Sequence, residues 1–404
     1  MKKSAYCLGV FLALSVPEAE AASREIRALF QPDPSQPSKN VFVNKTPNSG
    51  YCGSYPSECA DNNVFSIQLP VNFESRGSLK PGDGIPVKAP ANWRELTVRN
   101  PQTQESETVE VRITGIGSTY VLSPPATELT GIANPTDAHR ALWTANTWVY
   151  APPPCRYSGV GFVLPKTYQF FWKTSLEEAC TKFAAWNIPS MSFSNIDVAY
   201  ELRTPNPLGM SSGLYTGSLT YTIGPGGDFD LGPLFQPDDG SLTLDFVLDV
   251  QHTLKVDLPP GGNKVALEPE GGWQSWINGG RKPTRIFRDQ PFYLSASSRF
   301  KVMMLCTSNG GRACKLGSPK GNTTEVETFL TLPDGITNSS RAPVTLVPLL
   351  YNTWVGPFQP GLYVDRQAGS LRFEMTPFAV DFLLRPGLAD TLSGNITIVW
   401  DSDV

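Results

Sequence analysis

The sequence contains few histidines, few charged residues and no clusters of lysine or arginine. Only two of its 404 residues are histidines, and charged residues make up 17% of the chain. The formal net charge is −4 at pH 7. Because the sequence has no basic patch, it does not suggest a protein that binds nucleic acid or an anionic membrane surface.

Motifs for catalysis and for metal binding are also missing. No G-x-S-x-G elbow accompanies His139 or His252, so a Ser–His–Asp hydrolase is not supported. The acidic pairs at 228/230 and 238/239 are interpreted as solvated turn residues rather than acid–base partners. No CxxC motif occurs, so the sequence lacks the cysteine spacing that is typical of structural zinc sites. The sequence therefore predicts a protein that is not an enzyme and that binds no cofactor or metal.

Turn residues and strand-forming residues fill the sequence instead. The 37 prolines and 35 glycines are spread along the chain without a collagen-like period. Short alternating runs such as "VFSIQLPVNF" and "ETVEVRITGIG" lie between turn signals such as "KPGDG" and "NPQTQ". One segment, residues 175–186, has apolar residues at helical spacing behind a capping Ser175. These patterns predict an all-β protein with one short helix.

The first residues have the pattern of a secretory signal peptide. Lys2 and Lys3 precede an apolar run, and Ala19-Glu20-Ala21 is a cleavage site of the A-x-A type. The run at residues 5–16 spans about 12 residues, whereas a membrane helix needs roughly 20. We expect residues 1–21 to be removed on export, leaving a mature chain that starts at Ala22 or Ser23 and has no transmembrane segment.

The remaining cysteines predict disulfide bonds. An even number of cysteines in an exported chain favours pairing, and six cysteines allow fifteen connectivities. The cysteines fall into three couples that are local in sequence. The predicted bonds are Cys52–Cys59, Cys155–Cys180 and Cys306–Cys314.

The length of the chain suits two domains. We predict a first β-domain at residues 22–230, a Gly-, Pro- and Asp-rich linker at 231–240, and a second β-domain at 241–404. The second domain opens on a long alternating strand, "SLTLDFVLDV", and about seven short strands in roughly 165 residues suit an immunoglobulin-like sandwich. Both domains are expected to be immunoglobulin-like β-sandwiches.

A short element occurs twice, as "YTGSLTYTI" from Tyr215 and as "LSGNITIVW" from Leu392. Each copy is interpreted as the late strand of a sandwich, and the second is followed only by Asp-Ser-Asp-Val. The second sandwich then lacks its last strand and has an open apolar groove that another chain can fill. The alternative is an ordinary sheet edge protected by Asp401 and Asp403. The predicted groove residues are Leu242, Leu244, Phe246, Leu248, Ile396, Ile398 and Trp400.

The second half resembles the pilin domain of chaperone–usher fimbriae of Gram-negative bacteria. The resemblance rests on the long first strand, on "GGWQSWINGGRKPTRIFRDQPFYLSASSRFKVMMLC", on the nearby "ACKL" and on the Gly-containing last strand. The whole layout is similar to a two-domain tip adhesin. This resemblance implies a pilin domain without its last strand, which a periplasmic chaperone and then the adjacent pilin subunit complete. It also implies an outer-membrane usher, export through the periplasm, and an extracellular place at the fimbrium tip. The residues after Trp400 depart from the family, whose members often finish close to an aromatic residue.

The first domain is expected to bind a host or surface receptor. Its many aromatic side chains could stack on sugar rings, so a carbohydrate is the receptor class that they suggest. The candidate loop is "NPTDAHRALWTANTW". Two other hypotheses stay open: a structural tip or adaptor subunit without a receptor, and a secreted enzyme with an accessory β-sandwich module. The candidate receptor-binding residues are Asp137, His139, Arg140, Trp143 and Asn146.

Overall fold

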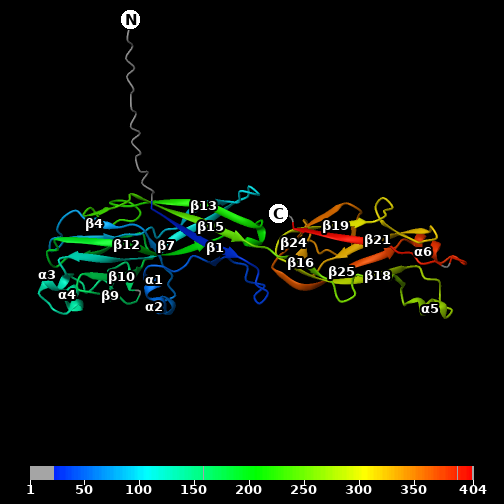
Figure 1. The fold of residues 1–404 in the computed structure, drawn as a ribbon, viewed down its shortest axis with the longest axis horizontal. Helices are drawn as coiled ribbons and strands as arrows, with labels where there is room; N and C mark the ends of the chain where they lie inside the picture. The colour runs from blue at the N-terminus through cyan, green and yellow to red at the C-terminus, as the bar shows by residue number, and fades with distance from the viewer. Residues whose placement is uncertain (1–21, 158, 389, 403–404) are drawn as a thin grey trace, which may run out of the picture.

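The protein is seen in a computed structural model that describes residues 22–402 apart from residues 158 and 389. The predicted signal peptide at residues 1–21 lies outside the described residues. Two β-rich lobes lie end to end along the long axis (Figure 1), and each has its own hydrophobic core. The all-β class is confirmed.

The first lobe is built on a thirteen-stranded sheet with the order β14-β4-β12-β7-β6-β13-β15-β1-β2, to which β3, β8, β9 and β10 add at the side. A two-stranded sheet joins β11 to β5. The strands are β1 (Ala22–Phe30), β2 (Val43–Asn44), β3 (Ile67–Leu69), β4 (Phe73–Ser75), β5 (Gly84–Val87), β6 (Arg94–Arg99), β7 (Ser106–Ser123), β8 (Arg156–Tyr157), β9 (Phe162–Val163), β10 (Thr167–Lys173), β11 (Cys180–Phe183), β12 (Ser190–Arg203), β13 (Gly213–Thr222), β14 (Phe235–Pro237) and β15 (Ser241–Val250). The helices are α1 (Tyr51–Ser54), α2 (Pro56–Asp61), α3 (Ala126–Thr130), α4 (Pro135–Ala141) and the 3₁₀ turn η1 (Pro207–Gly209).

The second lobe packs a seven-stranded sheet, β16-β18-β25-β21-β20 with β17 and β23 at the side, against a four-stranded sheet, β22-β24-β19-β26. Its strands are β16 (Leu254–Asp257), β17 (Glu268–Pro269), β18 (Ile286–Ala296), β19 (Phe300–Cys306), β20 (Cys314–Gly317), β21 (Thr323–Thr331), β22 (Ile336–Thr337), β23 (Val347–Leu349), β24 (Trp354–Pro360), β25 (Val364–Met375) and β26 (Ile396–Ser402). Its helices are α5 (Trp273–Ile277) and α6 (Pro377–Leu383).

The long alternating strand β15 belongs to the first lobe, which corrects the predicted domain division. It pairs antiparallel with β13 and parallel with β1. Its alternate apolar side chains lie in the first core, because both neighbouring strands belong to that sheet. These side chains therefore cannot line a groove in the second lobe, as had been predicted for Leu242, Leu244, Phe246 and Leu248.

The predicted linker at residues 231–240 is also part of the first lobe. Phe235 is fully buried in β14, which pairs with β4. Asp238 accepts hydrogen bonds from the backbone and side-chain nitrogens of Asn72, at 2.9 and 2.6 Å. The acidic residues of this stretch therefore fasten loops rather than face solvent freely. The first core ends at Val250, and the second begins with Leu254.

The junction between the lobes is short and hydrogen-bonded. His252 Nε2 donates to the carbonyl oxygen of Met210 in the first lobe, at 2.9 Å. Its Nδ1 lies 3.0 Å from Ser297 Oγ in the second lobe, and Ser297 Oγ also accepts from the amide of Thr253 at 2.9 Å. An ion pair, Arg299–Glu105 at 3.8 Å, crosses the same boundary.

The predicted helix at residues 175–186 is wrong, because tertiary contacts override the local pattern. Cys180–Phe183 forms β11 and pairs with β5. The Lys182 ammonium group is buried and donates to three carbonyl oxygens, those of Ala145 at 2.8 Å, Tyr150 at 3.0 Å and Asn146 at 3.3 Å. Burial lowers the pKa of Lys182 to about 8. A strand conformation places both Cys180 and Lys182 on the buried side, since side chains alternate along a strand.

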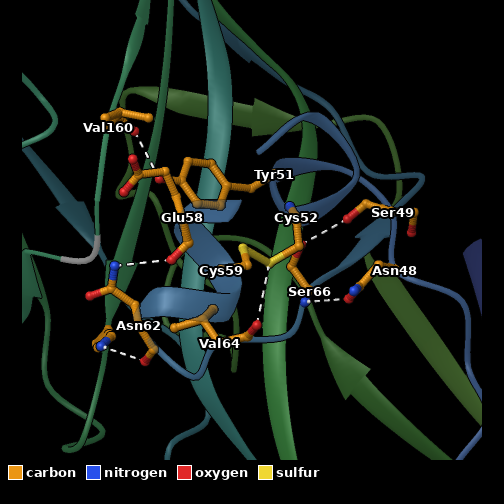
Figure 2. The surroundings of a disulfide bond; sticks show 11 residues. Asn48, Ser49, Tyr51, Cys52, Glu58, Cys59, Asn62, Val64, Ser66 and Val160 are labelled. Carbon is orange, nitrogen blue, oxygen red and sulfur yellow. Dashed lines mark hydrogen bonds between the residues drawn. A yellow bond between two sulfur atoms is a disulfide. The ribbon is translucent and has the colours of Figure 1, made fainter. Parts of the chain in front are cut away.

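All three predicted disulfide bonds are present, joining Cys52 to Cys59, Cys155 to Cys180 and Cys306 to Cys314. Figure 2 shows the first of these, which links α1 to α2 beside the Tyr51 ring. Tyr51 Oη donates to the carbonyl oxygen of Val160 at 2.9 Å, so this small helical unit is tied to the segment before β9.

The glycine of the first repeated element allows two strands to approach closely. A Cβ atom added at Gly217 in β13 would lie 2.3 Å from the carbonyl oxygen of Thr97 in β6. That distance is far inside van der Waals contact, and the obstacle is backbone.

We therefore expect Gly217→Ala to lower the free energy of unfolding of the first lobe by about 1–3 kcal/mol, the usual cost of overpacking. Gly77→Ala is the matched control, because a Cβ atom at Gly77 meets nothing within 4 Å. Urea unfolding followed by circular dichroism measures both variants. Equal stabilities of the two variants would contradict the close approach.

Candidate functional site

The candidate site is an open groove in the second lobe, beside the last strand β26. It consists of two adjoining hollows of about 180 and 380 Å³, which share Asn263, Val265, Phe373 and Ile396. We call this the β26 groove. Its apolar lining residues are Val256, Leu258, Val265, Leu267, Phe292, Leu316, Val326, Leu371, Phe373, Ile396, Ile398 and Trp400.

The groove exists because two sheets end beside it. β26, the red strand near the C-terminus in Figure 1, is the last strand of the four-stranded sheet and pairs with β19 alone. β16 is the last strand on the path of the seven-stranded sheet. Among the described residues no strand pairs with the outer edge of β26. Its outward backbone groups therefore have no ladder partner.

Side chains of β26 form one wall of the groove and cover the core only partly. Ile396, Ile398 and Trp400 are half-buried and pack on the second core. The Trp400 ring lies 5.1 Å from the Phe292 ring and 5.9 Å from the Phe300 ring, measured between centroids. Phe373 on the groove floor keeps 9% of its surface exposed, whereas Phe292 beside it has none. The edge of the second core beside β26 is therefore covered by side chains that are themselves only half-buried.

Contacts before the strand fix the position of β26. The backbone groups of Ser393 and Gly317 exchange two hydrogen bonds of 2.9 Å. A Cβ atom at Gly394 would lie 2.9 Å from the carbonyl oxygen of Lys315, so the glycine permits this approach. The Cys306–Cys314 disulfide joins β19 to β20 across the two sheets. The groove therefore keeps its width near the start of β26.

The lining of the groove is uncharged. The polar residues that contribute to it are amides, Asn263, Gln290 and Asn395. The nearest charged residue on β26 is Asp401, whose Oδ2 lies 3.3 Å from Lys301 Nζ. An uncharged groove with an unpaired strand edge suits an extended apolar segment.

The structure brings together three of the predicted groove residues, Ile396, Ile398 and Trp400, and their role in assembly stays a prediction. Sequence reasoning missed the opposite wall, formed by Val256, Leu258 and the segment around Val265, together with the floor residue Phe373. No local signal distinguishes these residues, because their role depends on which strands end beside β26.

The predicted receptor residues fall into a buried pair and an exposed trio. His139 and Trp143 belong to the first core and have 0% and 3% of their surface exposed. His139 Nε2 lies 2.9 Å from the carbonyl oxygen of Leu164, to which it donates, and Nδ1 lies 2.7 Å from Tyr120 Oη. These two side chains are structural, which corrects their assignment as receptor contacts.

The three exposed residues lie on and after α4. Asp137 and Arg140 form an ion pair of 2.8 Å on α4, and the amide of Asp137 donates to Oδ1 of Asn134, which caps the helix. Asn146 has a positive φ of 67° and its Oδ1 accepts from the amide of Thr147. Close to this segment in the sequence, two exposed rings, Tyr150 and Tyr157, stack with centroids 5.7 Å apart.

Neither a metal site nor a membrane helix is found in the part of the chain that the structure describes. In that part, no three His, Cys, Asp or Glu side chains gather as a cation site would require. No described helix is long and apolar enough to cross a membrane.

Comparison with known proteins finds likeness only among solved structures. No protein-family model and no curated protein matches the sequence. A chain from a chaperone–tip adhesin complex of CFA/I fimbriae is similar at 10% identity and a TM-score of 0.26, over 95% of this chain and 97% of that one. A variant of the CFA/I adhesin CfaE of enterotoxigenic E. coli is similar at 10% identity and a TM-score of 0.27, over 95% and 93%.

A third similar structure comes from the CsuC–CsuE chaperone–tip adhesion subunit complex of the Csu pili of Acinetobacter baumannii. It has 11% identity and a TM-score of 0.21, over 84% of this chain and 91% of that one. All three structures are only distantly similar to this chain. At such low TM-scores they give no residue correspondence, so the function is inferred from the groove itself.

The buried histidine makes the first lobe sensitive to acid. Burial lowers the pKa of His139 below its ordinary value of about 6.5. As the pH falls through about 6.5, the unfolded chain takes up a proton first, so folding stability decreases until the folded pKa is reached. In His139→Gln this contribution is absent. We therefore expect the advantage in Tm of the natural chain over the variant to shrink between pH 7.5 and pH 5. An advantage that stays constant over this range would contradict a buried neutral imidazole.

Proposed function

We propose that this chain is a fimbrial tip adhesin whose second lobe joins a fibre by accepting a strand from another chain. The observation that carries the proposal is the unpaired edge of β26 beside an apolar groove that opens into the second core. An added strand satisfies the outward backbone groups of β26 and covers Ile398, Trp400 and Phe373 at once.

The chemistry of the groove describes the strand that would fill it. Side chains alternate between the two faces of a strand, so every second residue of the incoming segment points into the groove. Those inward residues would be apolar, because most of the lining side chains are apolar and none is charged. A periplasmic chaperone and an adjacent pilin subunit are the partners that would supply such strands, with an outer-membrane usher handling the exchange.

The first lobe would carry the receptor-binding surface. Of the residues predicted for this role, Asp137, Arg140 and Asn146 are exposed and available. The stacked rings of Tyr150 and Tyr157 offer an aromatic surface of the kind on which sugar rings pack. We assign receptor binding, with a glycan as the first class to test, to this part of the lobe.

The groove proposal is tested with a nine-residue peptide that alternates Val or Ile with Thr, added to the purified chain. At a peptide concentration about 100 times its Kd, binding would stabilise the second lobe by about 2.7 kcal/mol. Such a gain corresponds to a rise in Tm of several degrees. Differential scanning calorimetry measures the rise, and a shuffled peptide of the same composition should give none.

Two single substitutions on β26 provide the matched pair of variants. Ile398→Asp places a charge in the groove and should abolish the rise in Tm. Thr397→Asp places the same charge on the exposed opposite face and should preserve it. A folded chain whose second lobe no alternating peptide stabilises would refute the proposal.

A structural adaptor without a receptor remains the second candidate, and a binding screen separates it from an adhesin. We expect the full chain to bind cells or a glycan array, and Arg140→Ala combined with Asn146→Ala to weaken binding about tenfold, equivalent to roughly 1.4 kcal/mol. Arg288→Ala, an exposed site on β18 of the second lobe, is the control and should change nothing. Absence of binding by a folded, strand-complemented chain would favour the adaptor.

A further inference from the structure

The start of β1 is held by a carboxylate that comes from a distant turn. The backbone nitrogen of Ala22 lies 2.8 Å from Oδ2 of Asp239. The other oxygen of the same carboxylate accepts from the amide of Ser241 at 3.0 Å. The bond from Ser241 contributes most, and the bond from Ala22 next, to holding the pKa of Asp239 below its usual value. The carboxylate is therefore fixed at the start of β15, beside the first residue of β1.

The first strand needs such an anchor because only one of its edges is paired along its full length. β1 runs parallel to β15 from Ala22 opposite Leu242 to Phe30 opposite Val250. On its other edge, β2 pairs with Ala28 and Leu29, and the residues after β2 bond to the backbone of Arg27, so the ladder there does not reach Ala22. A terminal strand with a free edge frays readily unless its end is tied.

Fraying of this strand would open the first core. Ala22 has 8% of its surface exposed, and Ile26, Ala28 and Phe30 have at most 3%. All four side chains belong to the main core cluster of the first lobe. The position of Ala22 therefore matters for the lobe as a whole.

The sequence places a processing site at this same residue. Ala19-Glu20-Ala21 has the small-x-small pattern that precedes cleavage by a signal peptidase. Hydrolysis of the peptide bond between Ala21 and Ala22 adds water, leaving a carboxylate on Ala21 and an amine on Ala22 that takes up a proton. The amide N–H that faces Asp239 in the uncut chain thereby becomes an ammonium group.

We propose that export processing between Ala21 and Ala22 creates an α-ammonium group that forms an ion pair with Asp239 and anchors β1 in the first sheet. The bond from the Ala22 amide to the Asp239 carboxylate is already charge-assisted, and a protonated amine adds a full positive charge opposite that carboxylate. Cleavage one residue later would remove Ala22 together with this contact. The inference is independent of the receptor and of the β26 groove.

The cleavage position is tested by intact mass and N-terminal sequencing of the chain exported to a bacterial periplasm. We expect the mature protein to begin with Ala22. A mature chain that begins at Ser23, or at any other residue, would overturn the proposal, and this readout does not depend on the stability of a variant.

The ion pair is tested by a double-variant cycle on the exported full chain. Asp239→Asn is compared in two backgrounds, one that starts at Ala22 and one with a serine inserted between Ala21 and Ala22, which moves the charge away. We expect Asp239→Asn to lower the Tm of the first lobe by about 2–4 °C in the first background. In the second background the loss should be clearly smaller.

Asp238→Asn is the matched control, because the neighbouring carboxylate binds Asn72 and does not contact the chain start. Its effect on Tm should be the same in both backgrounds. Equal losses for Asp239→Asn in the two backgrounds would show that Asp239 contributes only hydrogen bonds to backbone N–H groups, and the ion pair would be refuted.

Discussion

The requirement that a β-strand satisfy both of its edges and bury one face governs the second lobe. Its four-stranded sheet ends at β26, whose outer edge has no partner among the described strands, and Trp400 on this strand is only half-buried. The Cys306–Cys314 bond and the close approach at Gly394 tie the two sheets together near the start of β26. In the proposed function, a strand from another chain would cover this apolar surface and remove it from water.

The two copies of the repeated element have the same local pattern but different numbers of neighbouring strands. In β13 the copy lies between β6 and β15, and both Tyr215 and Tyr221 are fully buried. In β26 the copy has one neighbouring strand, and its apolar side chains are half-buried. In both copies a Cβ atom on the glycine would meet a carbonyl oxygen, that of Thr97 or of Lys315. The shared glycine reflects a shared need for close backbone contact, while the number of neighbouring strands decides whether the edge is open.

Local features of the sequence predict many of the strands, but not which sheet and core each strand joins. The alternation in Ser241–Val250 correctly predicts a strand with one buried face, yet alternation does not say which core receives that face. Propensity suggested a helix at residues 175–186, where the Cys155 bond and the three carbonyl oxygens around Lys182 impose a strand. For the site, Ile396, Ile398 and Trp400 could be predicted because they follow one another on a single strand, whereas the facing wall comes from a segment more than a hundred residues earlier. His139 looked functional as a rare polar residue, but the aromatic cluster that buries it is not visible in sequence.

The placement of β15 in the first lobe also determines how the two lobes are connected mechanically. The second lobe begins directly after it, through residues 251–253, and His252 bonds to both sides of the junction. A load applied to the second lobe enters β15 along its own axis, and β15 is flanked over its length by β13 and β1. Such a load would shear the β15–β13 and β15–β1 ladders at the same time. Shearing strains many hydrogen bonds together, whereas peeling a strand away from its neighbour breaks them one by one. The contact at Asp239 lies at the far end of these ladders, where Ala22 starts β1. The strand that carries the connection to the second lobe is therefore hydrogen-bonded along both of its edges.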